Sequence, residues 1–426
     1  MNRGRLWVVS ALAAISLAAP VGAQAPDALP APAPSSPVDA YYAAHLEAPI
    51  WFRDEANRAA AAKLPEILRG ALLDGFDGSA AAATVEAAIA RGQPGDEIII
   101  SSAWVRFVQA LNAPVNGVSY GDPDLALKPP SADAILAQAA KAASLSDHVD
   151  RVAQINPLYA ALHDDAAKAG GPTDPRVRAT LDRLRLLPAN GRAILVDVAS
   201  AQLMMIEDGR VVDSMKVIVG KKSGATPILA STVHYVTFNP YWHIPQDIAR
   251  ARVAPVVLKR GVGYLTLARY QTVAGFGGDK ETPIDPISVD WKAVRDGTAE
   301  VHVRQLAGPQ NMMGRLKIGF VNDYGVFLHD TPKKELFAKD MRFLSHGCIR
   351  LEHPERLASW LLGHEATAPS DDSELQVLLA KGVPIFLTYL TARPGDDGTI
   401  AFADDIYSLD TPGAEKAILA SASSAH

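Results

Sequence analysis

The chain has 426 residues, 48% of them hydrophobic, and a formal net charge of -6 at pH 7. Its length and apolar content are sufficient for two or three domains with their own cores. Because no basic stripe offsets the acidic balance, the composition excludes nucleic acid as an expected partner.

Residues 1–23 have the pattern of a secretory signal peptide. Arg3 and Arg5 give a basic start, residues 6–19 form a short apolar run, and residues 21–23 are small. We expect a periplasmic protein with no integral membrane domain once the signal is removed, or one tethered to the membrane if the segment is retained. Residues 24–40, rich in Ala, Pro and Ser, predict a flexible linker.

Residues 41–170 have a helical pattern and predict an all-α domain. We expect helices over residues 59–73, 79–90 and 97–111, and further helices after Pro130 and Pro157. This half of the chain carries no recognisable chemistry. Residues 171–191 follow a Gly-Gly-Pro break and predict a connecting helix.

The pattern changes to β-strands over residues 192–391. We expect strands at residues 193–198, 202–206, 211–219, 233–238, 316–320, 326–328 and 383–389, and a helix that begins at Pro354. Residues 239–310 are irregular and predict a capping insertion, and residues 392–426 predict a C-terminal extension and tail. The fold class is therefore α+β, an all-α domain followed by a mostly β domain with an inserted capping subdomain.

The only cysteine, Cys348, lies in the segment with the clearest chemical signal. This segment begins with His329 and ends with Ser-His-Gly-Cys-Ile-Arg-Leu at residues 345–351. A thiol of ordinary pKa, about 8.5, needs a base to become a nucleophilic thiolate. His329 and His346 are both close enough in sequence to serve. Gly347 lets the backbone pass closely, so that N–H groups can face a developing oxyanion.

Two other interpretations of Cys348 stay open. With His329, His346 and His353 it could form a zinc site with an open position, although the spacing lacks the paired Cys-x2-Cys of common structural sites. Alternatively, Cys348 is an inert small core residue, since free cysteines are often buried.

Residues 329–332 (His-Asp-Thr-Pro) and 345–351 together resemble the signature of the L,D-transpeptidase (YkuD-type) catalytic domain. Segments that resemble the larger Gram-negative branch, which has an N-terminal helical scaffold domain, are residues 226–227, 239–242, 313–315 and 405–407. The resemblance extends from residue 41 to about residue 410. Larger members of the family carry a separate peptidoglycan-binding domain, for which this sequence has no pattern.

The resemblance implies that Cys348 is the nucleophile and His329 the base, with the carbonyl of Asp330 orienting the imidazole. His346 and Gly347 would complete the orienting and oxyanion-binding group. No metal and no cofactor are expected.

Ser345, Arg350 and Trp242 are implied as substrate contacts. Arg350 could instead be structural, paired with Asp330 or Glu352. Further cations that would suit a substrate with several carboxylates are Lys333, Lys334, Arg342 and Arg356.

The implied substrate is a tetrapeptide stem of peptidoglycan. The thiolate would attack the L-centre carbonyl of its third residue, release D-alanine, and pass the acyl group to the third-residue side-chain amine of an acceptor stem. The capping insertion would exclude water from the thioester. An L,D-carboxypeptidase that hydrolyses the same thioester and a non-catalytic wall-binding scaffold are the alternatives. Cell-wall synthesis proteins are candidate partners, and carbapenems are expected to acylate Cys348.

Overall fold

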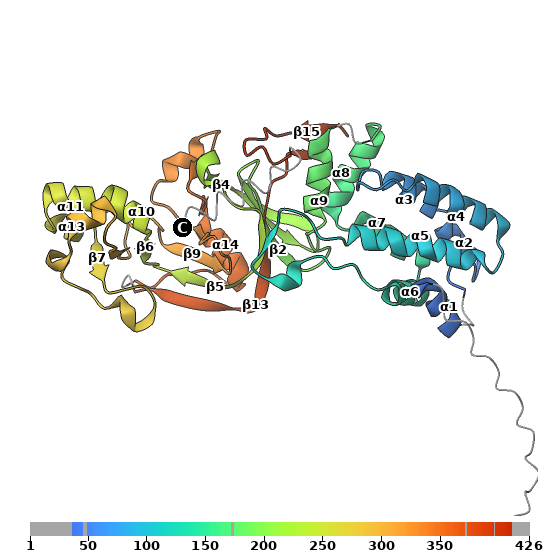
Figure 1. Ribbon diagram of the computed structural model, residues 1–426, viewed down its shortest axis with the longest axis horizontal. Helices are drawn as coiled ribbons and strands as arrows, with labels where there is room; N and C mark the ends of the chain where they lie inside the picture. The colour runs from blue at the N-terminus through green and yellow to red at the C-terminus, as the bar shows by residue number, and fades with distance from the viewer. Residues whose placement is uncertain (1–35, 46–48, 172–173, 371–372, 396, 411–426) are drawn as a thin grey trace, which may run out of the picture.

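The computed structural model describes residues 36–45, 49–171, 174–370, 373–395 and 397–410. The expected signal peptide, most of the expected linker and the tail beyond residue 410 lie outside these residues. Among the described residues, no helix is long and apolar enough to cross a membrane. The molecule is elongated, with helices at one end, a β-sheet in the middle and an inserted subdomain at the other end (Figure 1).

The N-terminal end is almost entirely helical. Its elements are α1 (Pro37–Ala44), α2 (Glu55–Ala61), α3 (Leu64–Gly70), α4 (Ser79–Arg91), α5 (Asp96–Leu111), β1 (Ser119–Tyr120), η1 (Pro123–Leu125), α6 (Ala132–Lys141), α7 (Leu145–Gln154) and α8 (Pro157–Lys168). The single helix expected over residues 59–73 is wrong, because the chain turns between α2 and α3. Pro65, in the first turn of α3, has no N–H to continue the hydrogen-bond ladder of α2.

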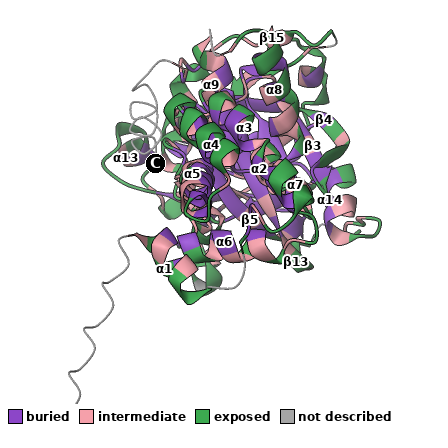
Figure 2. Ribbon diagram, turned by 90° about the vertical axis from the view of Figure 1, so that its right-hand side faces the viewer, coloured by how far each residue is buried: buried purple, intermediate pink, exposed green. Residues whose placement is uncertain are grey.

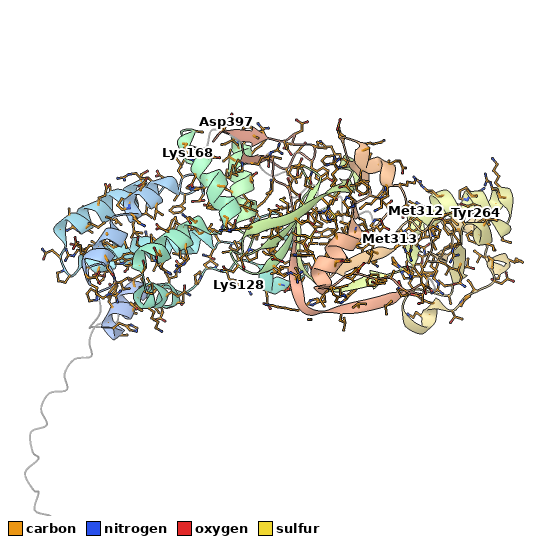
Figure 3. The ribbon with its side chains drawn as sticks, turned by 180° about the vertical axis from the view of Figure 1, so that it is seen from behind. Lys128, Lys168, Tyr264, Met312, Met313 and Asp397 are labelled. Atoms are coloured by element: carbon orange, nitrogen blue, oxygen red, sulfur yellow. The ribbon has the colours of Figure 1, made fainter. Side chains whose placement is uncertain are left out.

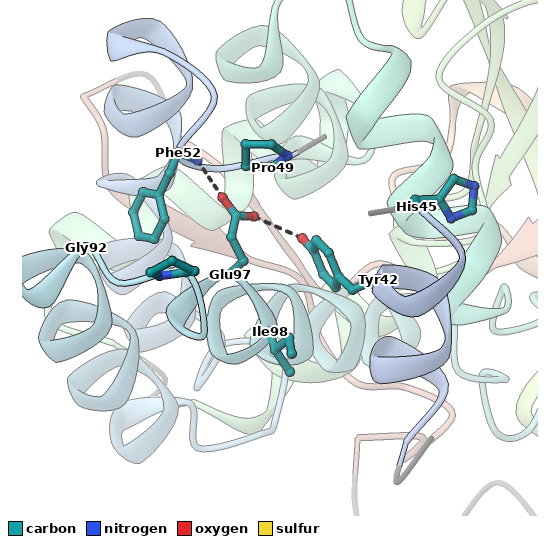
Figure 4. Close-up of a pocket in the computed structure, with 8 residues that line it drawn as sticks. Tyr42, His45, Pro49, Phe52, Gly92, Glu97 and Ile98 are labelled. Carbon is teal, nitrogen blue, oxygen red and sulfur yellow. Dashed lines mark hydrogen bonds between the residues drawn. The ribbon is translucent and has the colours of Figure 1, made fainter. Parts of the chain in front are cut away.

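A buried carboxylate organises this helical end. Glu97 is 5% exposed and accepts hydrogen bonds from the backbone N–H groups of Trp51 and Phe52. It also accepts one from the hydroxyl of Tyr42 (Figure 4). These bonds fasten the segment before α2 to α5. Figure 2 views the molecule from this end and shows the buried residues gathered where the helices face one another.

The middle of the molecule is a sheet that closes on itself. Its strands are β2 (Arg192–Asp197), β3 (Gln202–Glu207), β4 (Arg210–Gly220), β5 (Leu229–Phe238), β9 (Leu316–Phe320), β10 (Leu328–His329), β11 (Phe343–Ser345), β12 (Ile349–Leu351) and β13 (Leu375–Thr388). They follow the order β5-β13-β2-β3-β4-β12-β10-β9, and β9 pairs back onto β5. β11 joins the edge of β4, and β1 adds to β5.

The largest buried cluster of the protein lies within this closed sheet. Inward side chains such as Val196, Val217 and Ile318 are 0% exposed, as expected for apolar residues that alternate along strands. Two helices complete the region, α9 (Pro175–Leu184) at the junction with the N-terminal helices and α14 (Pro354–Leu362) against the sheet. The sheet therefore gives its loops a rigid support.

Three strand boundaries differ by more than one residue from the expected ones. β5 begins at Leu229 rather than at residue 233, because it already pairs with β13 there. β10 begins at Leu328 rather than at residue 326, because the side chain of Asn322 engages the backbone N–H and carbonyl of Val326 in a turn. β13 begins at Leu375 rather than at residue 383, because it pairs with β5 on both sides of an irregularity.

Residues 239–310, called the cap below, leave the sheet between β5 and β9. The elements of the cap are β6 (Trp242–Ile244), α10 (Gln246–Ile248), η3 (Ala249–Val253), α11 (Ala254–Arg260), α12 (Gly263–Leu267), β7 (Tyr270–Val273), η4 (Gly278–Glu281), η5 (Pro286–Ser288), α13 (Trp291–Asp296) and β8 (His302–Gln305). Its sheet, in the order β6-β8-β7, packs on the helices around a separate cluster that includes Val257 and Val303.

A hydrogen bond joins the two segments that connect the cap to the sheet. The side-chain amide of Asn311 donates to the carbonyl of Pro240 at 3.0 Å. Met312 and Met313 follow at this junction (Figure 3), and Met313 is 4% exposed. The cap is thus joined to the sheet through a packed, hydrogen-bonded junction.

The C-terminal segment returns to the sheet. β14 (Ala392–Pro394) and β15 (Ile400–Phe402) form a hairpin beside α8 and α9 (Figure 1). Tyr407 then stacks on Tyr389 with ring centroids 5.3 Å apart, and both belong to the main buried cluster.

Candidate active site

Neighbouring strands bring the predicted histidine and cysteine together. β10 pairs in parallel with β12, with Leu328 opposite Ile349 and His329 opposite Arg350. Leu328 and Ile349 are both 0% exposed and face the core. Since side chains alternate along a strand, His329 and Arg350 lie on the opposite face, and so does Cys348, two residues before Arg350.

His329 is held in one tautomer by a backbone carbonyl. Its Nδ1 lies 2.5 Å from the carbonyl oxygen of Asp330. Because that oxygen can only accept, Nδ1 carries the hydrogen and Nε2 is left with its lone pair. Burial lowers the pKa of His329 to about 4, and the charge of Arg350 acts in the same direction. The ring is therefore neutral at neutral pH, as a general base must be.

The side chain of Asp330 fixes the loop that carries this carbonyl. Its carboxylate accepts from the N–H of Arg315 at 2.9 Å and of Thr331 at 2.7 Å, and pairs with Lys334 Nζ at 2.8 Å. Lys334 thus takes the place suggested for Arg350. Within the described part of the chain, Arg350 forms an ion pair with neither Asp330 nor Glu352.

Hydrogen bonds within the turn that carries Cys348 stabilise its conformation. The hydroxyl of Ser345 donates to the carbonyl of Cys348 at 2.6 Å and accepts from the N–H of Gly347 at 3.2 Å. Gly347 has a φ of +123°, which L residues rarely adopt. Its N–H, expected to face an oxyanion, is therefore used by Ser345, whereas no described residue accepts from the N–H of Cys348.

Two residues whose roles the sequence analysis missed anchor this turn. Thr226 Oγ1 donates to the carbonyl of Gly347 at 2.7 Å and accepts from the N–H of Gly220 at 2.9 Å. The hydroxyl of Tyr407 donates to the carbonyl of Gly220 at 2.5 Å and accepts from the N–H of Thr226 at 3.2 Å. The Thr-Pro and Asp-Ile-Tyr segments already stood out as family-like, and this network gives them a physical purpose.

The thiol of Cys348 is protonated at rest. Burial raises its pKa, while a backbone hydrogen bond from Phe327 and the charges of Lys317 and Arg350 oppose that rise. As a residue Cys348 is only partly buried, so a ligand can reach it. The thiol donates to the carbonyl of Gly325 at 3.8 Å. A protonated thiol and a neutral imidazole on one face of the sheet have the protonation states that a nucleophile–base pair has before proton transfer.

Comparisons with known proteins identify two domains in the chain. Residues 191–388 match the family model of the L,D-transpeptidase catalytic domain (YkuD), and residues 36–165 match the model of the Scaffold domain. The chain contains an L,D-transpeptidase catalytic domain. The predicted family and the α+β fold class are thereby confirmed.

One curated relative and two solved structures illustrate the similarity. A Haemophilus influenzae protein is 26% identical over 389 residues, which cover 87% of this chain and 77% of that protein. That protein is itself described as an L,D-transpeptidase by inference. The Ldtfm–avibactam carbamoyl enzyme is 16% identical with a TM-score of 0.23, over 48% of this chain and 50% of that chain. An L,D-transpeptidase from Mycobacterium smegmatis is 15% identical with a TM-score of 0.24, over 46% and 58%. The chain spans about half the length of the two solved chains.

Charged residues of the cap act on His346, next to the candidate active site. His346 is exposed, and partial burial of its ring lowers its pKa, together with the charges of Lys221 and Arg252, while Asp247 acts in the opposite direction. Arg252 and Asp247 belong to η3 and α10 of the cap. Arg252 and Asp247 therefore lie close enough to His346 for their charges to act on its ring.

Two other predicted site residues have local partners. Trp242 packs against the buried cluster of the cap. His353 precedes α14, and its ring nitrogen lies 3.9 Å from the carboxylate of Glu352. Within the part of the chain that the structure describes, no three His, Cys, Asp or Glu side chains are grouped as metal ligands.

Lys317 is a site residue that the sequence analysis of the L,D-transpeptidase domain missed. It lies in β9 directly opposite His329, and its Nζ is 4.1 Å from the centroid of the Phe327 ring. A single charge between Leu316 and Ile318 in an apolar strand is the signal that could have revealed it.

Proposed function

We propose that this protein is a periplasmic peptidoglycan L,D-transpeptidase in which Cys348 is the nucleophile and His329 is the base. The observation that carries the proposal is the 2.5 Å contact between His329 Nδ1 and the carbonyl of Asp330. It leaves Nε2 free to accept a proton on the face of the sheet that Cys348 shares. The L,D-transpeptidase domain match supports the same assignment.

In the first half-reaction, His329 Nε2 takes the thiol proton while Sγ of Cys348 attacks the third-residue carbonyl of a tetrapeptide donor stem. The free N–H of Cys348 is the first candidate donor to the resulting oxyanion. The carbon–nitrogen bond then breaks, His329 returns the proton to the departing D-alanine amine, and a thioester remains.

In the second half-reaction, the side-chain amine of an acceptor stem attacks the thioester carbon. The amine loses its proton to His329, the new amide bond forms, and the thiolate of Cys348 departs and is reprotonated. Attack by water would release a tripeptide instead and make the protein an L,D-carboxypeptidase. A cap that closes over the thioester would favour transpeptidation by limiting access of water, and the charges of Arg252 and Asp247 that act on His346 support such a position of the cap.

The proposal revises the expected roles of Ser345 and Trp242 and keeps those of His346 and Arg350. Ser345 is 2% exposed and its hydroxyl is engaged within the turn, so it shapes the turn rather than contacting the substrate. His346 is exposed at the mouth of the site and is a candidate for positioning the substrate. Trp242 supports the fold of the cap. Arg350 is the candidate to hold a carboxylate of the substrate.

The test is mass spectrometry of purified tetrapeptide muropeptides incubated with the protein and with its Cys348→Ala variant. Cross-linked dimers and free D-alanine with the wild type alone would support the proposal. Tripeptides without dimers would identify the carboxypeptidase. Neither product, no acyl adduct on Cys348 with a carbapenem, and full cellular function of Cys348→Ala would identify a wall-binding scaffold.

A further inference from the structure

A half-buried lysine beside the candidate nucleophile lacks a carboxylate partner. Among the described residues no ion pair involves Lys317, although burial lowers its pKa. The nearby Glu374 carboxylate accepts instead from the backbone N–H of Tyr241 at 3.0 Å. Partly burying a cation without a carboxylate partner costs stability, so a lysine at this position is a candidate for a functional role.

Strand register places Lys317 and Arg350 on either side of the candidate base. Lys317 is opposite His329 across β9 and β10, and His329 is opposite Arg350 across β10 and β12. Residues opposite one another share a face, and neighbouring strands lie about 4.8 Å apart. The ammonium of Lys317 leans over Phe327 at 4.1 Å from the ring centroid, towards the level of Cys348.

Arg350 also has unused donor capacity. Its Nε is buried and has no hydrogen-bond partner among the described residues. A guanidinium and an ammonium that flank one point form a site for a carboxylate, because both donate charge-assisted hydrogen bonds to oxygen.

We propose that Lys317 and Arg350 form a subsite that binds the C-terminal carboxylate of the donor peptide. In a donor cut before its last residue, that carboxylate is only one residue beyond the attacked carbonyl. It therefore falls beside Cys348, between the two cations. The identity of the donor rests on the proposed function, whereas the existence of a carboxylate subsite does not. The subsite favours donors that end one residue after the scissile bond over longer or amidated ones.

The first test compares alkylation of Cys348 by iodoacetate, which carries a carboxylate, with alkylation by neutral iodoacetamide. Both rates scale with the thiolate fraction, so their ratio isolates the recruitment of the carboxylate. We expect Lys317→Met to lower the iodoacetate-to-iodoacetamide rate ratio by about tenfold, as for loss of one nearby charge. Lys317→Arg should keep the ratio high. Lys339→Met, which removes an exposed lysine, is the matched control and should leave the ratio unchanged.

An unchanged ratio in Lys317→Met would overturn the proposal, and so would an equal fall in Lys339→Met.

The second test compares a tetrapeptide donor with its C-terminal carboxamide. Wild-type protein should prefer the carboxylate form, and Lys317→Met should lose that preference in kcat/KM. If tetrapeptides are not turned over while the alkylation ratio still depends on Lys317, the proposed function fails and the subsite stands. If tetrapeptides are turned over normally while the ratio is unchanged in Lys317→Met, the proposed function stands and the subsite fails.

Discussion

The carboxylate of Asp330 accepts a hydrogen bond from the backbone N–H of Arg315 at 2.9 Å. The same residue offers its carbonyl to the ring of His329. One residue thus fastens the candidate base to the strand through which the chain returns from the cap. Gly314 allows this close approach, because a Cβ there would lie 2.2 Å from the Asp330 carboxylate.

Removal of this carboxylate should be far more costly than removal of its cationic partner. We expect Asp330→Ala to lower the free energy of unfolding by about 2–3 kcal/mol, since it removes the acceptor of one buried and one partly buried backbone N–H group. Lys334→Ala should cost less than about 1 kcal/mol, because the Lys334 side chain is 48% exposed. Urea denaturation of both variants checks this. Equal losses would show that the ion pair, not the backbone contacts, dominates.

Gly314→Ala should be one of the most damaging glycine substitutions. The residue has a φ of +64° and its added Cβ would overlap the carboxylate of Asp330, so we expect a loss above about 3 kcal/mol. Gly363→Ala is the matched control. It has a φ of +76° but open space around the new Cβ, and it should cost only about 1 kcal/mol. Thermal or urea unfolding that ranks the two variants equally would contradict the steric argument.

Loss of the Thr226 hydroxyl should slow acylation more than it unfolds the protein. Thr226→Val keeps the shape but removes the bonds to Gly347 and Gly220, so the turn with Cys348 loses its anchor. We expect about a tenfold lower rate of acylation by a carbapenem, with about 1–2 kcal/mol of stability lost. Thr226→Ser retains the hydroxyl and should acylate at close to the wild-type rate. A normal rate of acylation in Thr226→Val would show that the turn with Cys348 keeps its conformation without the hydrogen bonds of Thr226.

The acidic limb of activity should lie near pH 4 rather than near pH 6.5, because burial lowers the pKa of His329 to about 4. The base works only in its neutral form, and a lowered pKa keeps it neutral further into acid. The measurement is the pH profile of kcat/KM for donor cleavage. An inflection near pH 6.5, the ordinary imidazole value, would show that His329 is solvated or is not the base.

The lowered pKa of His329 also makes the free energy of unfolding depend on pH. Between pH 6.5 and pH 4 the unfolded chain binds a proton at His329 that the folded chain does not bind, so the folded state loses stability as the pH falls through this window. The full effect is about 3 kcal/mol. His329→Gln should remove this part of the pH dependence. The check is the difference in unfolding free energy between wild type and variant at both ends of the window. A constant difference would contradict the lowered pKa.

Shortening the cap should shift the acyl-enzyme from transfer to hydrolysis. Trp242 and Gln305 pair directly across β6 and β8, so the chain can be closed there by a short turn. We expect more tripeptide relative to cross-linked dimer, because water reaches the thioester more easily. Product ratios from the muropeptide assay provide the measurement, and acylation by a carbapenem controls for folding of the site. An unchanged product ratio would show that the cap does not protect the thioester from hydrolysis.

The features of this protein that depend on residues close together along the chain could be predicted from the sequence. Apolar segments predicted the strands around residues 193–219, and the connecting helix expected within residues 171–191 is α9. The one cysteine, with His329 a fixed distance before it, identified the catalytic domain. Local periodicity, caps and a compact motif are properties of short segments, and such segments carry the same physical preferences in any fold.

The set of distant residues that meet at Cys348 could be read only from the folded chain. The pairing of β9 with β10 and of β10 with β12 sets Lys317 and Arg350 around His329. The folded chain also shows that Asp330 pairs with Lys334, four residues further along, and not with Arg350. Strand register follows from how the whole sheet closes, and a one-residue slip would turn every one of these side chains to the other face. Packing of the whole core selects the strand register, so the register cannot be predicted from any single segment of the sequence.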